Sequence, residues 1–333
     1  MLNISLIFIA SALLMLVNGW TDAPVTVATA VSSKAVSFNK AVLLSAISNL
    51  LGGITMCFFG RSVAVSVYEI SGLSGQSAEA LPCLIAAVLT VVAWSLLALK
   101  FGLPTSESHA LLSSLSGSGV AAIGFAAINT AEWLKVVIGL AVTTYPLVIL
   151  SYFTATAVKN RLKLGNNRFK RLQIIGALLS SFSHGAQDSQ KFAAVLAVAL
   201  SLTRPNTVDG GTVFVPNWTV LFSVGMITAG TFLGGRKIVN SIKEFAPNDP
   251  QAGFFADFTS AITLSVLSVF GVPAATTVAK TMAILGAGMV STPKLQEKKS
   301  LIKMLVVWGL TFPACFIISF LLSNALIFIS IKI

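Results

Sequence analysis

The chain has 333 residues, of which 55% are hydrophobic and only 10% are charged, and its formal net charge is +11. Soluble globular proteins carry about 25% charged residues, so this composition excludes an ordinary water-soluble domain and indicates a polytopic membrane protein. The basic residues gather in short loops, which argues against nucleic acid as a partner and favours a role in membrane orientation.

Apolar runs near or above the roughly 20 residues needed to cross a bilayer recur along the whole chain. They cover residues 2–17, 41–60, 81–99, 134–158, 220–234 and 304–329. The first run has no charge and no cleavage site, so it predicts a retained helix rather than a signal peptide. The three cysteines lie singly in apolar sequence and predict neither a disulfide nor a zinc site.

Polar residues and helix breakers interrupt the first apolar run at residues 18–24, here called the first signature. It contains Asn18, Gly19, Asp22 and Pro24. Because glycine and proline both disfavour a continuing helix, we expect the first spanning helix to break here.

A second kind of segment combines glycine, proline and hydroxyl residues. Gly102-Leu103-Pro104 precedes Thr105, Ser106, Glu107 and Ser108, and Gly271-Val272-Pro273 precedes Thr276 and Thr277. Proline followed by Thr or Ser is typical of a helix start, so we expect new helices over about 108–125 and 277–290. We interpret both segments as discontinuous or re-entrant elements that meet near the bilayer centre.

Residues 183–191, the second signature, repeat the polar pattern of the first in the second half of the chain. Gly185 and Gln187 are expected to break the helix here as well. Lys191 follows Asp188 by three residues, so in a helix both lie on one face and form an ion pair.

The two kinds of segment recur in the same order and at nearly the same spacing. Asp188 follows Asp22, and Pro273 follows Pro104, by almost the same offset of about half the chain. We therefore predict an all-α protein of two inverted-topology repeats, 1–158 and 172–333, joined by a basic cytoplasmic loop, 159–171. About ten crossings plus re-entrant segments, with both termini outside, place most of the Lys and Arg residues on the cytoplasmic side.

Two helix N-termini that face one cavity form a site for a small oxyanion, because their free backbone N–H groups carry partial positive charge. Hydroxyl and amide groups add donors to this site. The alternative is that the hydroxyls only cap helices or bond to backbone carbonyls. The candidate substrate contacts are Thr105, Ser106, Ser108, Thr276, Thr277 and Gln187.

Carboxylates beside an anion site must be protonated, paired with a cation or bound to a proton of the substrate. Monohydrogen phosphate carries a hydroxyl that donates to a carboxylate, whereas sulfate does not. The alternatives are helix capping for the two aspartates and a solvated cavity mouth for Glu107. The candidate coupling-ion residues are Asp22, Asp188, Glu107, Asn18 and Lys191.

The remaining ionisable residues in apolar sequence receive ordinary interpretations. His109 and His184 are expected to make hydrogen bonds within the fold. Asp257 and Lys280 are expected near segment ends, where their side chains reach the membrane surface.

These motifs resemble the inorganic phosphate transporter (PiT) family, whose duplicated signature is close to Gly-Ala-Asn-Asp-x-Ala-Asn. The matches are Asn18, Gly19 and Asp22 in the first half, and His184, Gly185, Asp188, Gln190 and Lys191 in the second. Residues 104–109 and, less closely, 273–278 match the family's Pro-x-Ser-Thr-Thr-His-like segments. The resemblance implies an inverted-repeat symporter with phosphate at the hydroxyl segments and Na⁺ or H⁺ coupling through the signature aspartates.

The chain departs from the family pattern at positions that bear on coupling and substrate. Val25, Thr21 and Gln187 replace polar signature residues, and Ala274 and Ala275 remove a hydroxyl from the second anion segment. Lys191 stands where sodium-driven members have a sodium-liganding asparagine, and its charge should repel Na⁺. We therefore favour H⁺ as the co-transported ion, with Na⁺ at Asp22 and Asp188 as the alternative.

The sequence thus predicts a secondary active symporter that imports inorganic phosphate by alternating access in the plasma membrane. A sulfate or other oxyanion permease and an uncoupled anion channel remain as alternatives. No cofactor is expected, and a homodimer is left open. An enzyme is disfavoured because no nucleophile–base pair or metal-ligand spacing occurs in the sequence.

Overall fold

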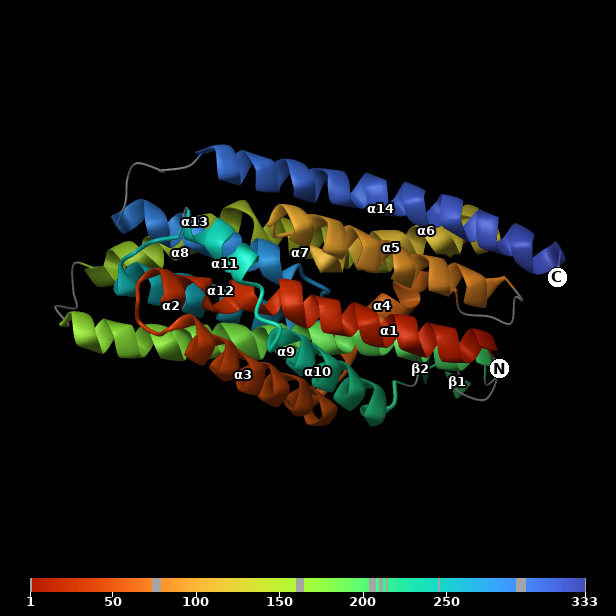
Figure 1. Cartoon of the computed structure of the whole chain (residues 1–333), viewed down its shortest axis with the longest axis horizontal. Coiled ribbons are helices and arrows are strands. Elements are labelled where there is room, and N and C mark those ends of the chain that lie inside the picture. Colours follow the sequence, from red (N-terminus) through yellow and green to blue (C-terminus); the bar gives the residue numbers. More distant parts are fainter. Residues whose placement is uncertain are drawn as a thin grey trace.

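The computed structural model describes residues 2–73, 79–159, 165–203, 208–209, 212–213, 215–244, 246–291 and 298–332. The described chain is an elongated helical bundle (Figure 1). The first half contains α1 (Leu2–Thr21), η1 (Ala23–Val27), α2 (Ala28–Ser32), α3 (Phe38–Phe59), α4 (Ser62–Ser71), α5 (Ala80–Phe101), α6 (Glu107–Ile123), η2 (Gly124–Ala127), α7 (Thr130–Thr143) and α8 (Tyr145–Lys159).

The second half contains α9 (Asn166–Thr203), α10 (Asn217–Thr231), α11 (Arg236–Lys243), α12 (Pro250–Val269), α13 (Thr276–Ser291) and α14 (Lys298–Lys332). Two short antiparallel strands, β1 (Val208–Asp209) and β2 (Thr212–Val213), precede α10 and pair Val208 with Val213. Apart from this strand pair, the described residues confirm the predicted all-helical class.

Seven stretches of the described residues are long and apolar enough to cross a membrane, and Thr130–Ala157, which contains α7 and most of α8, counts as one of them. The number rises to eight if α10 and α11, which are bent by 73° at their junction, form one span. Helix α9 carries the polar second signature and α13 has only 16 residues, and neither is among the seven. The protein is an integral membrane protein.

The first signature breaks its helix as predicted. Helix α1 ends at Thr21, and the 3₁₀ helix η1 follows with Pro24 in its first turn and Asp22 as its N-terminal flanking residue. Proline has no backbone N–H and cannot continue the hydrogen-bond ladder of α1.

The predicted break at the second signature is wrong. Helix α9 runs through Gly185 and Gln187 without interruption. At Gly185, a Cβ atom would lie 2.1 Å from the carbonyl oxygen of Asn49, so this glycine permits α3 and α9 to touch rather than ending α9. The Gln187 side-chain amide donates to the carbonyl oxygens of Leu264 in α12 and Val272 in the turn after it, both at 3.3 Å.

The two Gly-x-Pro segments form matching turns between paired helices. Gly102 ends α5 with a φ of 65° and Gly271 follows α12 with a φ of 68°, a left-handed conformation that favours glycine. The next amide donates to the carbonyl five residues back in each case, Leu103 to Ala98 at 3.0 Å and Val272 to Leu267 at 2.8 Å. Helices α6 and α13 then begin at Glu107 and Thr276, which confirms the expected helix starts.

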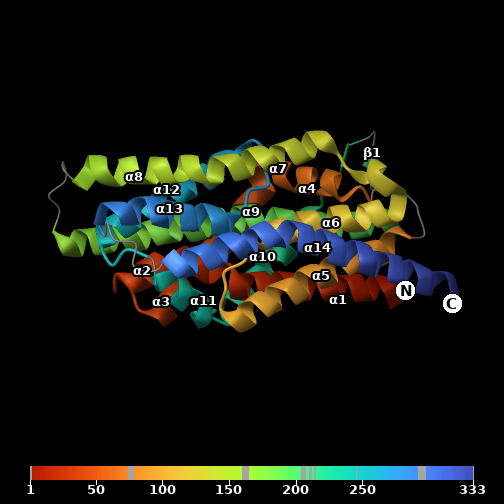
Figure 2. The ribbon, with the colours of Figure 1, turned by 90° about the horizontal axis from the view of Figure 1, so that it is seen from above.

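The two helical hairpins occupy opposite halves of the bundle. Hairpin α5/α6 lies in the half that contains both chain termini, and hairpin α12/α13 lies in the other half (Figures 1 and 2). We call their turns the first tip, residues 102–106, and the second tip, residues 270–275. The tips meet inside the bundle, where the Ser108 hydroxyl at the start of α6 lies 3.4 Å from the Ala274 carbonyl oxygen.

Glycines bring two pairs of helices into backbone contact in the same way. A Cβ at Gly19 of α1 or Gly230 of α10 would lie 1.9 Å from a carbonyl oxygen of the facing helix. A Cβ at Gly185 of α9 or Gly52 of α3 would lie 2.1 or 2.0 Å from one. Small residues at such crossings are a common packing device in membranes, because backbones can approach closely.

Candidate functional site

The candidate site lies where η1, α9 and the two tips meet. Every residue that the sequence singled out for substrate or ion binding is buried. None is more than 3% exposed; they are Asn18, Asp22, Thr105, Ser106, Glu107, Ser108, Gln187, Asp188, Lys191, Thr276 and Thr277.

Lys191 and Asp188 form the predicted ion pair. Lys191 Nζ lies 2.7 Å from Asp188 Oδ1, 2.7 Å from Ser108 Oγ and 2.6 Å from the Ala274 carbonyl oxygen. Each of the three ammonium hydrogens therefore has an acceptor. Because Ser108 lies in the first turn of α6 and Ala274 belongs to the second tip, the lysine ties both hairpins to α9.

The second oxygen of Asp188 faces the first signature. Asn18 Nδ2 donates to Asp188 Oδ2 at 3.2 Å, and the two residues are far apart in the sequence. His184 Nε2 lies 3.2 Å from the same oxygen, and its Nδ1 is 2.9 Å from Asn49 Oδ1. The expected hydrogen bond within the fold is thus confirmed for His184. The His109 ring instead packs against Phe312 with the two rings tilted by 31°, and its Nδ1 is buried without a partner among the described residues.

The signature aspartates meet at the centre of the molecule. Ligand atoms of Asp22, His184 and Asp188 all lie within 4.8 Å of one another. The carboxylate of Glu107 and the ammonium of Lys191 are also near Asp22, as is the side chain of Thr277. Within the described part of the chain, three acidic groups thus share a dry site with one ammonium, so neutrality requires two further positive charges or bound protons.

Thr21 joins Glu107 to the end of α1. Thr21 Oγ1 donates to Glu107 Oε1 and lies 2.8 Å from the Val17 carbonyl oxygen. A hydroxyl has a single hydrogen, which these two acceptors share. Glu107 is fully buried, so its interpretation as a solvated cavity mouth is wrong.

The hydroxyls of the first tip are already engaged by the protein. Thr105 Oγ1 accepts from Trp94 Nε1 at 3.0 Å, and Ser106 Oγ caps α6 by accepting from the His109 amide at 3.3 Å. Ser108 Oγ, in the first turn of α6, accepts a hydrogen bond from Lys191 Nζ. The contacts of Thr105 and Ser106 therefore match the alternative interpretation, in which these hydroxyls cap a helix or bond within the protein.

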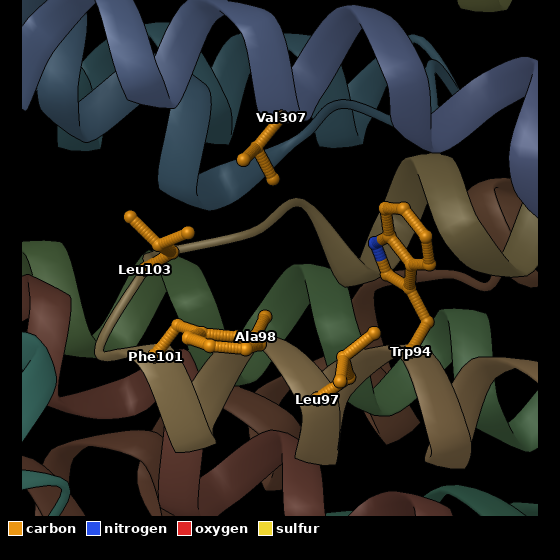
Figure 3. Close-up of a pocket in the computed structure, with 6 residues that line it drawn as sticks. All are labelled: Trp94, Leu97, Ala98, Phe101, Leu103 and Val307. Carbon is orange, nitrogen blue, oxygen red and sulfur yellow. The ribbon is translucent and has the colours of Figure 1, made fainter.

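An apolar pocket of about 100 Å³ backs the first tip (Figure 3). The Trp94 indole nitrogen points from this pocket toward the loop that carries Thr105. The pocket offers no polar group to an anion; its lining is Trp94, Leu97, Ala98, Phe101, Leu103 and Val307.

Two buried polar atoms without a hydrogen-bond partner belong to Thr276 at the start of α13 and to Gln187 of α9. Buried polar groups normally have hydrogen-bond partners, so such atoms point to a polar ligand or water. The neighbouring Thr277 hydroxyl faces the Asp22 carboxylate. Further orphaned atoms occur elsewhere among the described residues.

Sequence reasoning missed a second buried ion pair. Asp257 of α12 and Lys280 of α13 are 0% and 1% exposed and form a salt bridge, so the expectation that they reach the membrane surface is wrong. Lys280 lies one turn after Thr276, close to a tip that sits inside the bundle. The position of Lys280 close to the tip, rather than the apolar sequence around it, could have indicated that this residue is buried.

The chain is similar to known transporters over nearly its whole length. The model of the Phosphate transporter family matches residues 18–168 and 158–319. A probable low-affinity inorganic phosphate transporter of Bacillus subtilis (strain 168) is 28% identical over 314 residues, which cover 92% of each chain. A protein of the same description from Rhizobium meliloti (strain 1021) is 31% identical over 311 residues, 91% of this chain and 90% of the relative.

The fold also matches a solved structure described as the sodium-dependent phosphate transporter. The TM-score is 0.88, and the match covers 99% of this chain and 100% of the other at 20% sequence identity. At this identity the likeness concerns the fold.

Proposed function

Because the chain belongs to the phosphate transporter family, we propose that it imports inorganic phosphate with H⁺ across the plasma membrane by alternating access. The family relatives are transporters rather than enzymes, as expected from the sequence. The observation that carries the choice of H⁺ is the pairing of Lys191 with Asp188, next to the buried carboxyl group of Glu107.

The second tip supplies the proposed phosphate contacts. Thr276 at the start of α13 and Gln187 of α9 have buried polar atoms that lack partners among the described residues, and the Thr277 hydroxyl lies next to them, beside Asp22. The first turns of α6 and α13 add partial positive charge. We place Ser108 at the edge of this site and assign Thr105 and Ser106 a supporting role at the first tip.

Proton coupling follows from the charges already present. A Na⁺ ion held by Asp22 and Asp188 would lie close to the Lys191 ammonium, and like charges at such distances in a dry site repel strongly. A proton on Glu107 or Asp22 lowers the negative charge without adding a cation beside Lys191. Na⁺ at Asp22 and Asp188 is the alternative that the experiment below must distinguish.

Substrate choice rests on the same carboxylates. Monohydrogen phosphate has a hydroxyl that can donate to Asp22, whereas sulfate would bring only acceptors to an acidic site. A sulfate permease or an uncoupled anion channel would not use the carboxylates in this way.

The test is uptake of labelled phosphate into proteoliposomes. We expect uptake to follow an imposed inward H⁺ gradient in Na⁺-free choline buffer, to resist excess sulfate, and to lose its dependence on the gradient in the Glu107→Gln variant. Uptake driven by a Na⁺ gradient at symmetric pH would contradict proton coupling. Competition by sulfate would indicate an oxyanion permease, and flux that ignores every gradient would indicate a channel.

We also propose that the chain consists of two inverted repeats, 1–158 and 172–333, with both termini outside. The repeated glycine contacts, the matching tips and the opposite placement of the two hairpins support this arrangement. The N- and C-termini lie at the same end of the bundle, as an even number of crossings requires (Figures 1 and 2). A membrane-impermeant thiol reagent applied to intact cells should leave an Arg168→Cys variant unlabelled; labelling from outside would reverse the orientation.

A further inference from the structure

The second buried ion pair contains none of the residues assigned to phosphate and proton binding. Lys280 Nζ donates to Asp257 Oδ1, to Ser180 Oγ at 3.2 Å and to the Thr26 carbonyl oxygen at 3.0 Å. Thr29 Oγ1 lies 2.7 and 3.0 Å from the two Asp257 oxygens and so steadies the carboxylate. The ammonium is thus held by η1, α9 and α12 at once.

The ligands of Lys280 match those of Lys191 in kind. Each ammonium is bound by one carboxylate oxygen, one serine hydroxyl and one backbone carbonyl. In each case the carbonyl comes from backbone outside an α-helix, Ala274 in the second tip and Thr26 in the 3₁₀ helix η1. Unwound carbonyls and carboxylates are the oxygen ligands with which membrane transporters hold monovalent cations.

The charge of this site also fits a monovalent cation. Among the described residues, Asp257 is the one acidic group that forms a salt bridge with Lys280, and the two side chains neutralise each other in a dry interior. Thr26, Thr29 and Ser180 contribute dipoles without charge. Removing the ammonium would leave an anionic oxygen cage with a strong demand for one positive charge.

We propose that Lys280 is a tethered cation, whose ammonium permanently occupies a monovalent-cation site formed by Asp257, Ser180 and Thr26. Truncation of the lysine opens this site to Na⁺. The inference goes beyond the proposed function, because it concerns ion binding by the protein and does not depend on which ion drives transport.

The test measures Na⁺ binding by the purified Lys280→Ala variant in the absence of phosphate. We expect its Tm to rise by about 3 °C or more between choline chloride and about 100 mM NaCl, because a ligand that binds only the folded state stabilises it. Retention of radioactive sodium by the variant should exceed that of the unmodified protein. Both effects should vanish in the Lys280→Ala/Asp257→Ala double variant.

A matched control comes from the partly exposed ion pair of Lys135 and Glu132, whose side chains are 39% and 14% exposed. Water can solvate Glu132 when Lys135 is truncated, so Lys135→Ala should show no Na⁺-specific shift. A folded Lys280→Ala variant with equal Tm in NaCl and choline chloride would overturn the proposal. If that variant is recovered folded only in NaCl, the proposal holds; if it fails to fold in either salt, Na⁺ cannot replace the ammonium and the proposal is wrong.

Discussion

The two signatures place equivalent aspartates on different backbones. In the first, α1 ends at Thr21 and Asp22 stands at the junction with η1. In the second, α9 continues through Asp188 to Thr203. Pro24 follows Asp22 by two residues, whereas no proline follows Asp188 within α9. Proline accounts for the difference, because it cannot donate the backbone hydrogen bond that a continuing helix needs.

The backbone form decides which aspartate has a local cation. A continuous helix places Lys191 on the same face as Asp188 and one turn away. The two side chains pair there at 2.7 Å. The residue of the first signature that corresponds to Lys191 is Val25, which lies in η1. Asp22 therefore has no partner of this kind on its own segment, and its nearest acidic neighbours include Glu107.

The two tips also differ in the hydrogen-bond partners of their polar groups. The first tip is held by Trp94 on Thr105 and by Trp308, whose indole nitrogen donates to the Pro104 carbonyl at 3.1 Å. Directly after the second tip, the Thr276 hydroxyl has no partner among the described residues, and the Thr277 hydroxyl faces Asp22. In the proposed arrangement of two inverted repeats, the first half supplies Asp22 and Glu107 as titratable groups, and the second half supplies Lys191 as a fixed cation together with the hydroxyls at the start of α13.

The strongest test of this division compares Asp188→Asn with Asp22→Asn. Both variants should lose proton-driven phosphate uptake. Asp188→Asn should also lower the free energy of unfolding by about 3 kcal/mol, because it leaves the Lys191 ammonium buried without its counter-ion. Asp22→Asn should cost less than about 1 kcal/mol, because no direct ion pair is broken. Unfolding of the purified variants in detergent measures the difference.

A control separates the two roles of Asp188. In the Asp188→Asn/Lys191→Met variant both charges are absent, so most of the lost stability should return while uptake stays absent. Equal stability losses in the two single variants would show that the first signature also contains a structural ion pair, and the proposed division would then be wrong.

The features that the sequence predicted well are those set by local backbone chemistry. The breaks at Pro24, Gly102 and Gly271 follow from missing donors and left-handed turns. The Lys191–Asp188 pair follows from helical spacing alone. Each of these requires only a few consecutive residues.

The features that the sequence did not predict depend on contacts between distant segments. Gly185 is a breaker by propensity, but its role is to admit the Asn49 carbonyl of α3. Lys280 and Asp257 lie on separate helices, and the hairpin that joins these helices brings the pair together. Glu107 is buried and contacts Thr21 at the end of α1, which no local pattern around residue 107 reveals.

A smaller effect tests whether the helix crossings are equivalent even though the signatures are not. Gly19→Ala and Gly185→Ala each place a methyl group very close to a facing carbonyl oxygen, and overpacking of this kind costs about 1–3 kcal/mol. The two variants should lose similar stability, since the crossings α1/α10 and α3/α9 repeat the same contact. Gly225→Ala on α10 meets nothing within 4 Å and is the matched control, which should unfold like the unmodified protein. A much smaller loss for Gly19→Ala would mean that the break after Thr21 lets α1 move away from α10, and the crossings would then differ as the signatures do.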